Sequence, residues 1–85
     1  MNYTVIWDLS AERDLTSMWL ASRMRHAIRD AADRIDAMLQ WNPSDCGESR
    51  EGQRRVMHIW PLGVNFEIDE PRRRVRVTAV WSYWP

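Results

Sequence analysis

The chain has 85 residues, 45% of them hydrophobic, which is enough for one modest core and predicts a single domain over residues 1–85. Its 12 basic residues, all arginine, balance 12 acidic ones, and this zero net charge excludes a strongly basic nucleic-acid-binding protein on total charge alone. The balance is uneven, because residues 1–49 carry five Arg against eight Asp and Glu (−3) and residues 50–85 carry seven against four (+3). The zero total therefore hides a basic C-terminal half.

Cysteine content and hydropathy narrow the class of protein further. The one cysteine, Cys46, cannot form an intrachain disulfide, and no Cys/His spacing is typical of a zinc site, so we expect no bound metal. No apolar run approaches the roughly 20 residues of a membrane helix, and the N-terminus lacks a signal-peptide pattern. We therefore expect a cytoplasmic protein that does not associate with a membrane. The six tryptophans are expected to fill the small core, with Trp81 and Trp84 partly exposed.

The first half of the chain predicts a strand followed by two helices. Residues 3–7 are rich in β-branched and aromatic side chains, as a strand requires. Ser10 suits the N-cap of a helix over about residues 11–21, and Ser22 can cap a second helix that ends at Asn42-Pro43. The second helix carries an apolar stripe at 4-3-4-3 spacing, formed by Met24, Ile28, Ala31, Ile35 and Met38. Together the two helices predict a helical hairpin.

The second half predicts a polar loop and three strands. Residues 43–53 contain a proline and two glycines, and the strands follow at about 54–60, 62–69 and 72–81. The order β-α-α-β-β-β predicts an α+β fold, in which a small twisted antiparallel sheet carries the helical hairpin on one face.

Short turns between the three strands predict the residues on each face of the sheet. Alternation places Met57, Phe66 and Val75 on an apolar face that the helices cover. With the shortest turns, His58 is expected beside Asn65, which in turn neighbours Arg76. Glu67 is expected beside Arg74, and Asp69 between Arg54 and Arg72. The opposite, polar face gathers His58, Asn65, Glu67, Arg54, Arg74 and Arg76, flanked by Trp60 and Trp84. Two interpretations remain open: ordinary cross-strand ion pairs on a solvated sheet face, or a surface that contacts RNA.

Several segments, taken in their order, resemble a known family. They are YTVIW at the start, AADRIDAML in the second helix, an Asn-Pro after it, the loop residues GESR with Arg54-Arg55, and the final block PLGVNFEIDEPRRRVRVTAVW. Together they resemble the RelE/ParE superfamily of bacterial type II toxins, which are encoded beside a cognate antitoxin. The resemblance implies the same sheet and helical hairpin that the elements predict.

The resemblance also implies a choice of activities. RelE-like members cut mRNA in the ribosomal A site without a metal or another cofactor, whereas ParE-like members poison DNA gyrase. In both, the C-terminal segment of the antitoxin wraps around the toxin. We expect a RelE-like mRNA endoribonuclease, with a ParE-like gyrase inhibitor or an inactive protein that only binds its antitoxin as alternatives. Leu62-Gly63-Val64 stands where RelE-type sites carry an arginine, and this difference, with the lack of lysine, favours the alternatives.

The chemistry of phosphodiester cleavage selects the candidate site residues. Arginine holds phosphates and stabilises the phosphorane charge but does not act readily as a base, so proton transfer falls to His58, Tyr83 or Glu67. His58 is the best candidate, because histidine titrates near neutrality. The expected catalytic residues are His58, Arg54, Arg76 and Tyr83, and the expected phosphate-binding residues are Arg50, Arg55 and Arg74. Alternatively, His58 is a surface residue hydrogen-bonded to Asn65, and Arg50 and Arg54 anchor the loop or pair with Glu48, Glu51 or Asp69.

Overall fold

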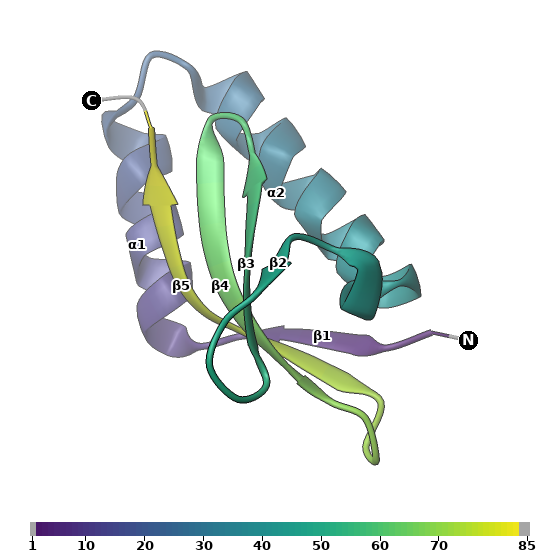
Figure 1. Cartoon of the computed structure of the whole chain (residues 1–85). Coiled ribbons are helices and arrows are strands. Elements are labelled where there is room, and N and C mark those ends of the chain that lie inside the picture. Colours follow the sequence, from purple (N-terminus) through teal and green to yellow (C-terminus); the bar gives the residue numbers. More distant parts are fainter. Residues whose placement is uncertain (1, 84–85) are drawn as a thin grey trace.

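The computed structural model describes residues 2–83, which form two helices, one short 3-10 helix and five strands. Figure 1 shows their arrangement, with the helices behind the sheet. In chain order they are β1 (Thr4–Trp7), α1 (Leu9–Ala21), α2 (Arg25–Trp41), η1 (Pro43–Asp45), β2 (Glu48–Ser49), β3 (Arg54–Ile59), β4 (Leu62–Asp69) and β5 (Arg74–Ser82).

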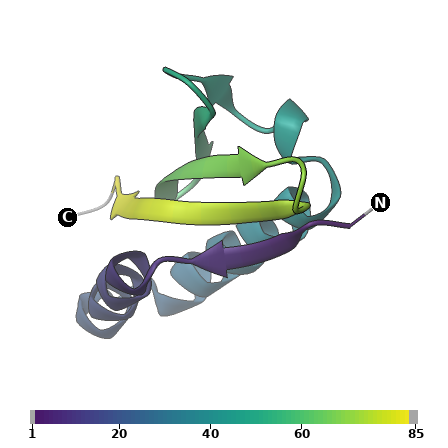
Figure 2. The ribbon, with the colours of Figure 1, turned by 90° about the horizontal axis from the view of Figure 1, so that it is seen from below.

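The strands form one sheet in the order β1-β5-β4-β3-β2, and both helices pack on the same side of it. Figure 2 shows these layers from below, with the helices on one side of the sheet and β2 and its loop on the other. The expected α+β fold is confirmed. The sheet is mixed rather than purely antiparallel, because β1 joins the edge of β5 in a parallel pair. No helix within residues 2–83 is long and apolar enough to cross a membrane.

The helix starts differ from those expected. α1 begins at Leu9, so Asp8 rather than Ser10 occupies the N-cap position, where its carbonyl accepts the Glu12 N–H at 2.9 Å. The Asp8 side chain makes no capping hydrogen bond. Ser22 does not cap α2. Its Oγ accepts the backbone N–H of Met24 at 2.8 Å within the link between the helices.

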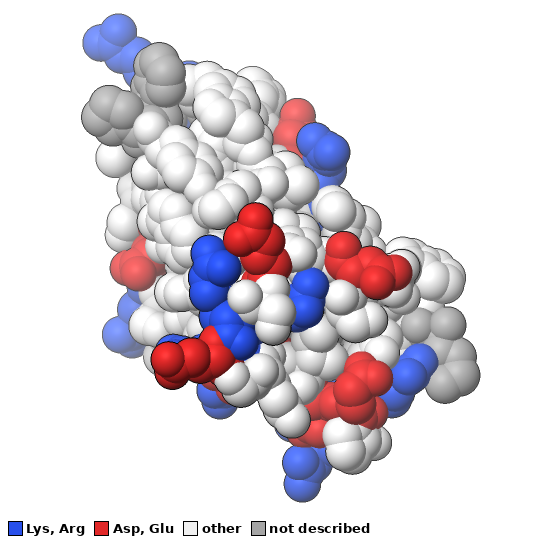
Figure 3. Space-filling view, viewed as in Figure 1, with Lys and Arg blue, Asp and Glu red and all other residues white. Residues whose placement is uncertain are grey.

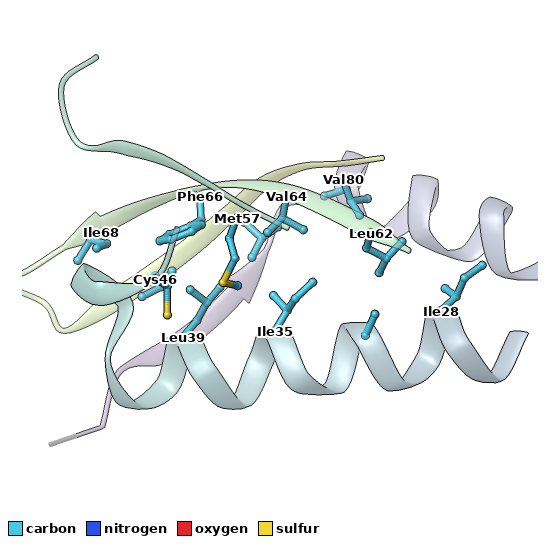
Figure 4. Close-up of a cluster of buried hydrophobic side chains, with 14 residues drawn as sticks. Ile28, Ile35, Leu39, Cys46, Met57, Leu62, Val64, Phe66, Ile68 and Val80 are labelled. Carbon is cyan, nitrogen blue, oxygen red and sulfur yellow. The ribbon is translucent and has the colours of Figure 1, made fainter. Parts of the chain in front are cut away.

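The core lies between the sheet and α2, as Figure 4 shows. Ile28, Ile35 and Leu39 of α2 face Val64 and Phe66 of β4, and all five are buried. The expectation that tryptophans fill the core is wrong for Trp41 and Trp60, whereas Trp7 and Trp19 pack against the core and Trp81 is partly exposed, as expected. Trp7, Trp19 and Trp81 are only partly buried, and Trp41 and Trp60 are 63% and 57% exposed. Aliphatic side chains and the single phenylalanine fill the space instead. Trp84 lies outside the described residues.

The strand register differs from the shortest-turn expectation by two residues. His58 pairs with Gly63 rather than Asn65, and Glu67 lies between Arg54 and Arg76 rather than beside Arg74. Asp69 pairs with Arg74. Because a shift of two residues preserves side-chain alternation, the assignment of residues to the two faces of β3 and β4 stays correct.

A β-bulge in β5 changes which side chains reach each face. Asn65 pairs with Ala79 and Phe66 with Val77, so Thr78 is an extra residue in this ladder. Beyond a bulge the alternation reverses. Val80 consequently enters the core, while Trp81 and Tyr83 join His58 on the face away from the helices.

Candidate nucleic-acid interface

The sheet face that points away from the helices, here the open face, has two chemically different ends. The aromatic end lies near the β3–β4 turn and comprises His58, Gly63, Trp81 and Tyr83. The charged end lies toward the β4–β5 turn and comprises Arg54, Glu67, Asp69, Arg74 and Arg76. Figure 3 looks onto this face: its upper part is largely free of charged side chains, and basic and acidic side chains interleave lower down.

The aromatic end is built around a glycine. A Cβ placed on Gly63 would lie 2.5 Å from atoms of the Trp81 ring, so the indole rests directly against the backbone of Gly63. The His58 ring stands at 72° to Trp81 with the ring centroids 6.0 Å apart, and it lies 5.2 Å from the Tyr83 ring. The Tyr83 N–H donates to the Pro61 carbonyl at 2.9 Å, and the residue is 50% exposed. The three rings therefore form a corner that is open to solvent.

At the charged end, arginines and carboxylates neutralise one another. The Arg76 Nε lies 3.5 Å from Asp8 Oδ1, and its Nη2 donates to Glu67 Oε1 at 3.4 Å. Next to them, Arg72 Nη1 donates to Asp69 Oδ2 at 3.0 Å. This hydrogen bond holds the pKa of the Asp69 carboxyl below its usual value, and the nearby charge of Arg74 lowers that pKa further. The charged end therefore combines several arginines with little net charge.

A depression of about 400 Å³ lies beside β3 and is lined by Arg50, Glu51, Arg54 and Asn65. Arg50 pairs with Glu48 at 3.3 Å. Among residues 2–83, no carboxylate lies within 4.0 Å of the Arg54 guanidinium, so the expected alternative in which Arg54 pairs with an acid is not observed. Arg54 can therefore bind a phosphate without first breaking an ion pair.

Arg55 does not join the other candidates. Its partner across the ladder is the buried Phe66, which places it on the helix side of β3. There its Nε donates to the Cys46 carbonyl at 2.9 Å and its Nη2 to the Gly47 carbonyl at 3.2 Å. Arg55 thus holds the loop before β2. Burial raises the pKa of the Cys46 thiol, as suits a packing residue rather than a nucleophile.

The four expected catalytic residues lie on one face but in two pairs. His58 and Tyr83 belong to the aromatic end, and Arg54 and Arg76 flank Glu67 at the charged end. His58 lies four positions after Arg54 in β3, or about 13 Å along the strand at the usual rise per residue. The depression lined by Arg54 and Asn65 begins at Arg54, and Asn65 stands opposite Val56, midway between Arg54 and His58 along β3. Within residues 2–83, no three His, Cys, Asp or Glu side chains are grouped so as to hold a metal ion.

Two residues of the open face were not expected from the sequence, Trp81 and Asp8. The spacing of Val75, Val77 and Val80 carries a signal for Trp81, because an apolar interval of two residues followed by one of three indicates a bulge. No local signal exists for Asp8. It reaches Arg76 only because β1 pairs with β5, from the opposite end of the chain.

No protein-family model and no curated protein matches the sequence. Solved structures do match. The toxin–antitoxin complex RelBE2 from Mycobacterium tuberculosis has 19% identity and a TM-score of 0.78, over 96% of this chain and 92% of that chain. The ParDE system from Pseudomonas aeruginosa has 14% identity and a TM-score of 0.72, over 94% and 95%. The isolated RelE toxin from E. coli has 11% identity and a TM-score of 0.66, over 94% and 83%. These similarities confirm the fold that the sequence resemblance implies.

Proposed function

We propose that this chain, which has the fold of the RelE/ParE toxin superfamily, is the toxin of a type II toxin–antitoxin system and cuts mRNA on the ribosome. One observation carries the nuclease proposal: the rings of His58 and Tyr83 lie side by side, with their centroids 5.2 Å apart. They lie on the same sheet face as the depression lined by Arg50 and Arg54. Two of the similar structures are toxin–antitoxin systems, which supports a cognate antitoxin as partner. The site of action is then the cytoplasm, where mRNA is translated.

The proposed reaction is an attack by the 2′-hydroxyl of a nucleotide on the adjacent phosphate. His58 takes the proton from the 2′-oxygen as the new P–O bond forms. The bond from phosphorus to the 5′-oxygen then breaks, and Tyr83 donates a proton to that leaving oxygen. The products are a 2′,3′-cyclic phosphate and a free 5′-hydroxyl. Arg54 stabilises the negative charge that builds on the phosphoryl oxygens in the transition state.

The aromatic end supplies the base-binding part of this proposal. Single-stranded RNA is recognised largely by stacking of exposed bases on aromatic side chains, at roughly 1–3 kcal/mol per base. Two rings beside His58 offer such surfaces: Trp81, which packs against the backbone of Gly63, and the half-exposed Tyr83. A base stacked there would leave the adjoining phosphate near the depression lined by Arg54.

Primer extension on translating ribosomes tests the nuclease proposal. The purified protein is expected to produce new cuts in the A-site codon, and His58→Ala is expected to reduce the cutting rate about 100-fold or more, because it removes the base. The matched control is His26→Ala, which removes an exposed histidine on α2. The double variant Arg54→Ala/His58→Ala is expected to abolish toxicity. Intact mRNA in an experiment where a known ribosome-dependent nuclease cuts would disprove the proposal, and normal cutting by His58→Ala would disprove the role of His58.

A gyrase inhibitor is the second candidate function. The low net charge at the charged end, where Arg76 lies between Asp8 and Glu67, favours a role that does not need phosphate contacts, and the ParDE structure shares the fold. Inhibition of DNA supercoiling by micromolar protein, without cuts on ribosomes, would select this function. Unchanged growth on expression without an antitoxin would instead select the third alternative, a protein that only binds its antitoxin.

A further inference from the structure

We infer that Asp8 and Glu67 are specificity-determining residues, because they hold Arg76 in an ion-pair latch that weakens the binding of free single-stranded RNA to the open face. The latch consists of these three residues, which come from the start of α1, from β4 and from β5. The inference rests on the proposed RNA-directed function and adds a control on its substrate: an RNA phosphate must displace two carboxylates before it can bind Arg76.

The geometry of the latch is suited to exchange of partners. The two contacts of Arg76, at 3.5 Å to Asp8 and 3.4 Å to Glu67, are longer than the 2.7–2.9 Å typical of strong charge-assisted hydrogen bonds. The Arg76 side chain is also 53% exposed, so solvent screens both pairs. A phosphate that accepts two parallel hydrogen bonds from the guanidinium can therefore compete with them.

The Asp8 carboxylate has alternative hydrogen-bond donors nearby, the free backbone N–H groups at the start of α1. It occupies the N-cap position of α1 with extended backbone angles, φ −57° and ψ 147°, and aspartate is among the preferred residues there. Its carboxylate nevertheless makes no capping hydrogen bond and lies near Arg76 instead. When a phosphate binds Arg76, the Asp8 carboxylate can turn to the free N–H groups of the first turn of α1. The displaced carboxylate then regains hydrogen bonds, and the latch has two alternative states.

Glu67 extends the effect to the neighbouring arginine. It is the register partner of Arg54 on one side and of Arg76 on the other, and its carboxylate forms an ion pair with Arg76 and not with Arg54. Its negative charge nevertheless repels a phosphate that approaches Arg54. An RNA strand that is free in solution must overcome this repulsion by itself. A strand held by the ribosome is already positioned, and the additional contacts of that assembly contribute to binding. The latch thus favours a positioned strand over free RNA.

Fluorescence anisotropy with a short labelled single-stranded RNA tests the latch in the full chain, at about 50 mM and about 200 mM salt. Asp8→Asn and Glu67→Gln are each expected to tighten binding several-fold, and the double variant more than tenfold. The salt slope should steepen by about one, as for one additional phosphate contact. Asp8→Asn is chosen because asparagine caps a helix as well as aspartate does, so α1 should remain stable. Circular dichroism verifies that each variant folds.

Two further variants isolate the role of Arg76. Asp33→Asn makes the same change in net charge as each single latch variant, on the exposed surface of α2, and each single latch variant must bind more tightly than this control. Arg76→Ala in the double-variant background is expected to cancel the gain. Equal affinities for the latch variants and Asp33→Asn would overturn the inference. Ribosome-dependent cutting is measured separately: a gain in RNA binding without cutting rejects only the proposed function, and cutting without such a gain rejects only the latch.

Discussion

The aromatic and charged ends of the open face use the same three strands but are held together by different forces. At the aromatic end, Trp81 packs directly on Gly63, and His58 and Tyr83 stand beside it. At the charged end, Arg76 touches its carboxylate partners only through long, solvent-exposed contacts. Close packing depends steeply on shape, whereas exposed ion pairs depend on charge and are screened by salt. The aromatic end is therefore a preformed surface, and the charged end can exchange partners.

The strongest test of this comparison is to shift the end of β5, beyond its bulge, by one residue. Insertion of one alanine after Ala79 would put Val80 opposite Gly63 and Trp81 opposite Leu62, so Val80 would leave the core and Trp81 would turn toward the helices. We expect a loss of roughly 3 kcal/mol or more in the free energy of unfolding, on the scale of core disruptions. Urea unfolding followed by far-UV circular dichroism measures it.

The control for the insertion is Thr78→Ala. This variant keeps the extra residue and removes only the hydrogen bond from Thr78 Oγ1 to the Asn65 carbonyl, so a loss of about 1 kcal/mol is expected. If the insertion cost no more than this substitution, the register beyond the bulge would not control which side chains reach the open face.

The next largest effect tests the packing of the aromatic end. Gly63→Ala places a methyl group where the Trp81 ring lies and is expected to cost about 1–3 kcal/mol of stability, as overpacking does. Near-UV circular dichroism should also change as the indole moves. In a Trp81→Ala background the same substitution should be neutral or stabilising, because the space is then free and alanine suits a strand better than glycine. An equal cost in both backgrounds would show that Trp81 does not rest on Gly63.

The smallest effect belongs to the charged end and depends on pH. The hydrogen bond from Arg72 lowers the pKa of Asp69 in the folded protein, so the ionised carboxylate stabilises the fold above the ordinary aspartate pKa of about 3.9. That contribution is lost as the pH falls through the lowered folded-state pKa. The melting temperature of the wild type should therefore fall slightly more on acidification than that of Asp69→Asn, by a few degrees at most. Parallel melting curves for the two proteins would contradict this assignment.

Local sequence patterns predicted the elements well, because each follows from its own side chains. The end of the second helix at Asn42-Pro43 matches α2, and residues 62–69 match β4. The predicted stripe is correct at Ile28, Ala31 and Ile35, but its last buried residue is Leu39 rather than Met38, which is 38% exposed. The N-cap of α1 was misplaced by two residues, since Asp8 and Ser10 are both suitable capping residues and the sequence does not distinguish them. Trp41 and Trp60 were misassigned for a similar reason: aromatic content alone does not say whether a ring lies in the core or on the surface.

The site was only partly predictable. Side-chain alternation placed His58, Arg54, Arg74 and Arg76 on one face, and an even shift in register left that result intact. Tyr83 was expected at the site, but its place beside His58 depends on the bulge at Thr78. Arg55 was grouped with the phosphate-binding residues although its own alternation, opposite Phe66, directs it to the helix side. Composition selected the residue types, and register decided which of them meet.

The sequence by itself determined the order of elements, the apolar face and the basic bias of the second half, because these depend on neighbours along the chain. Tertiary structure alone decided that β1 lies parallel to β5, which brings Asp8 to Arg76, and that a bulge turns Trp81 and Tyr83 toward His58. Both depend on contacts between residues far apart in the chain, which no local pattern records. The +3 charge of residues 50–85 is accordingly offset at Arg76 by an aspartate from the first half.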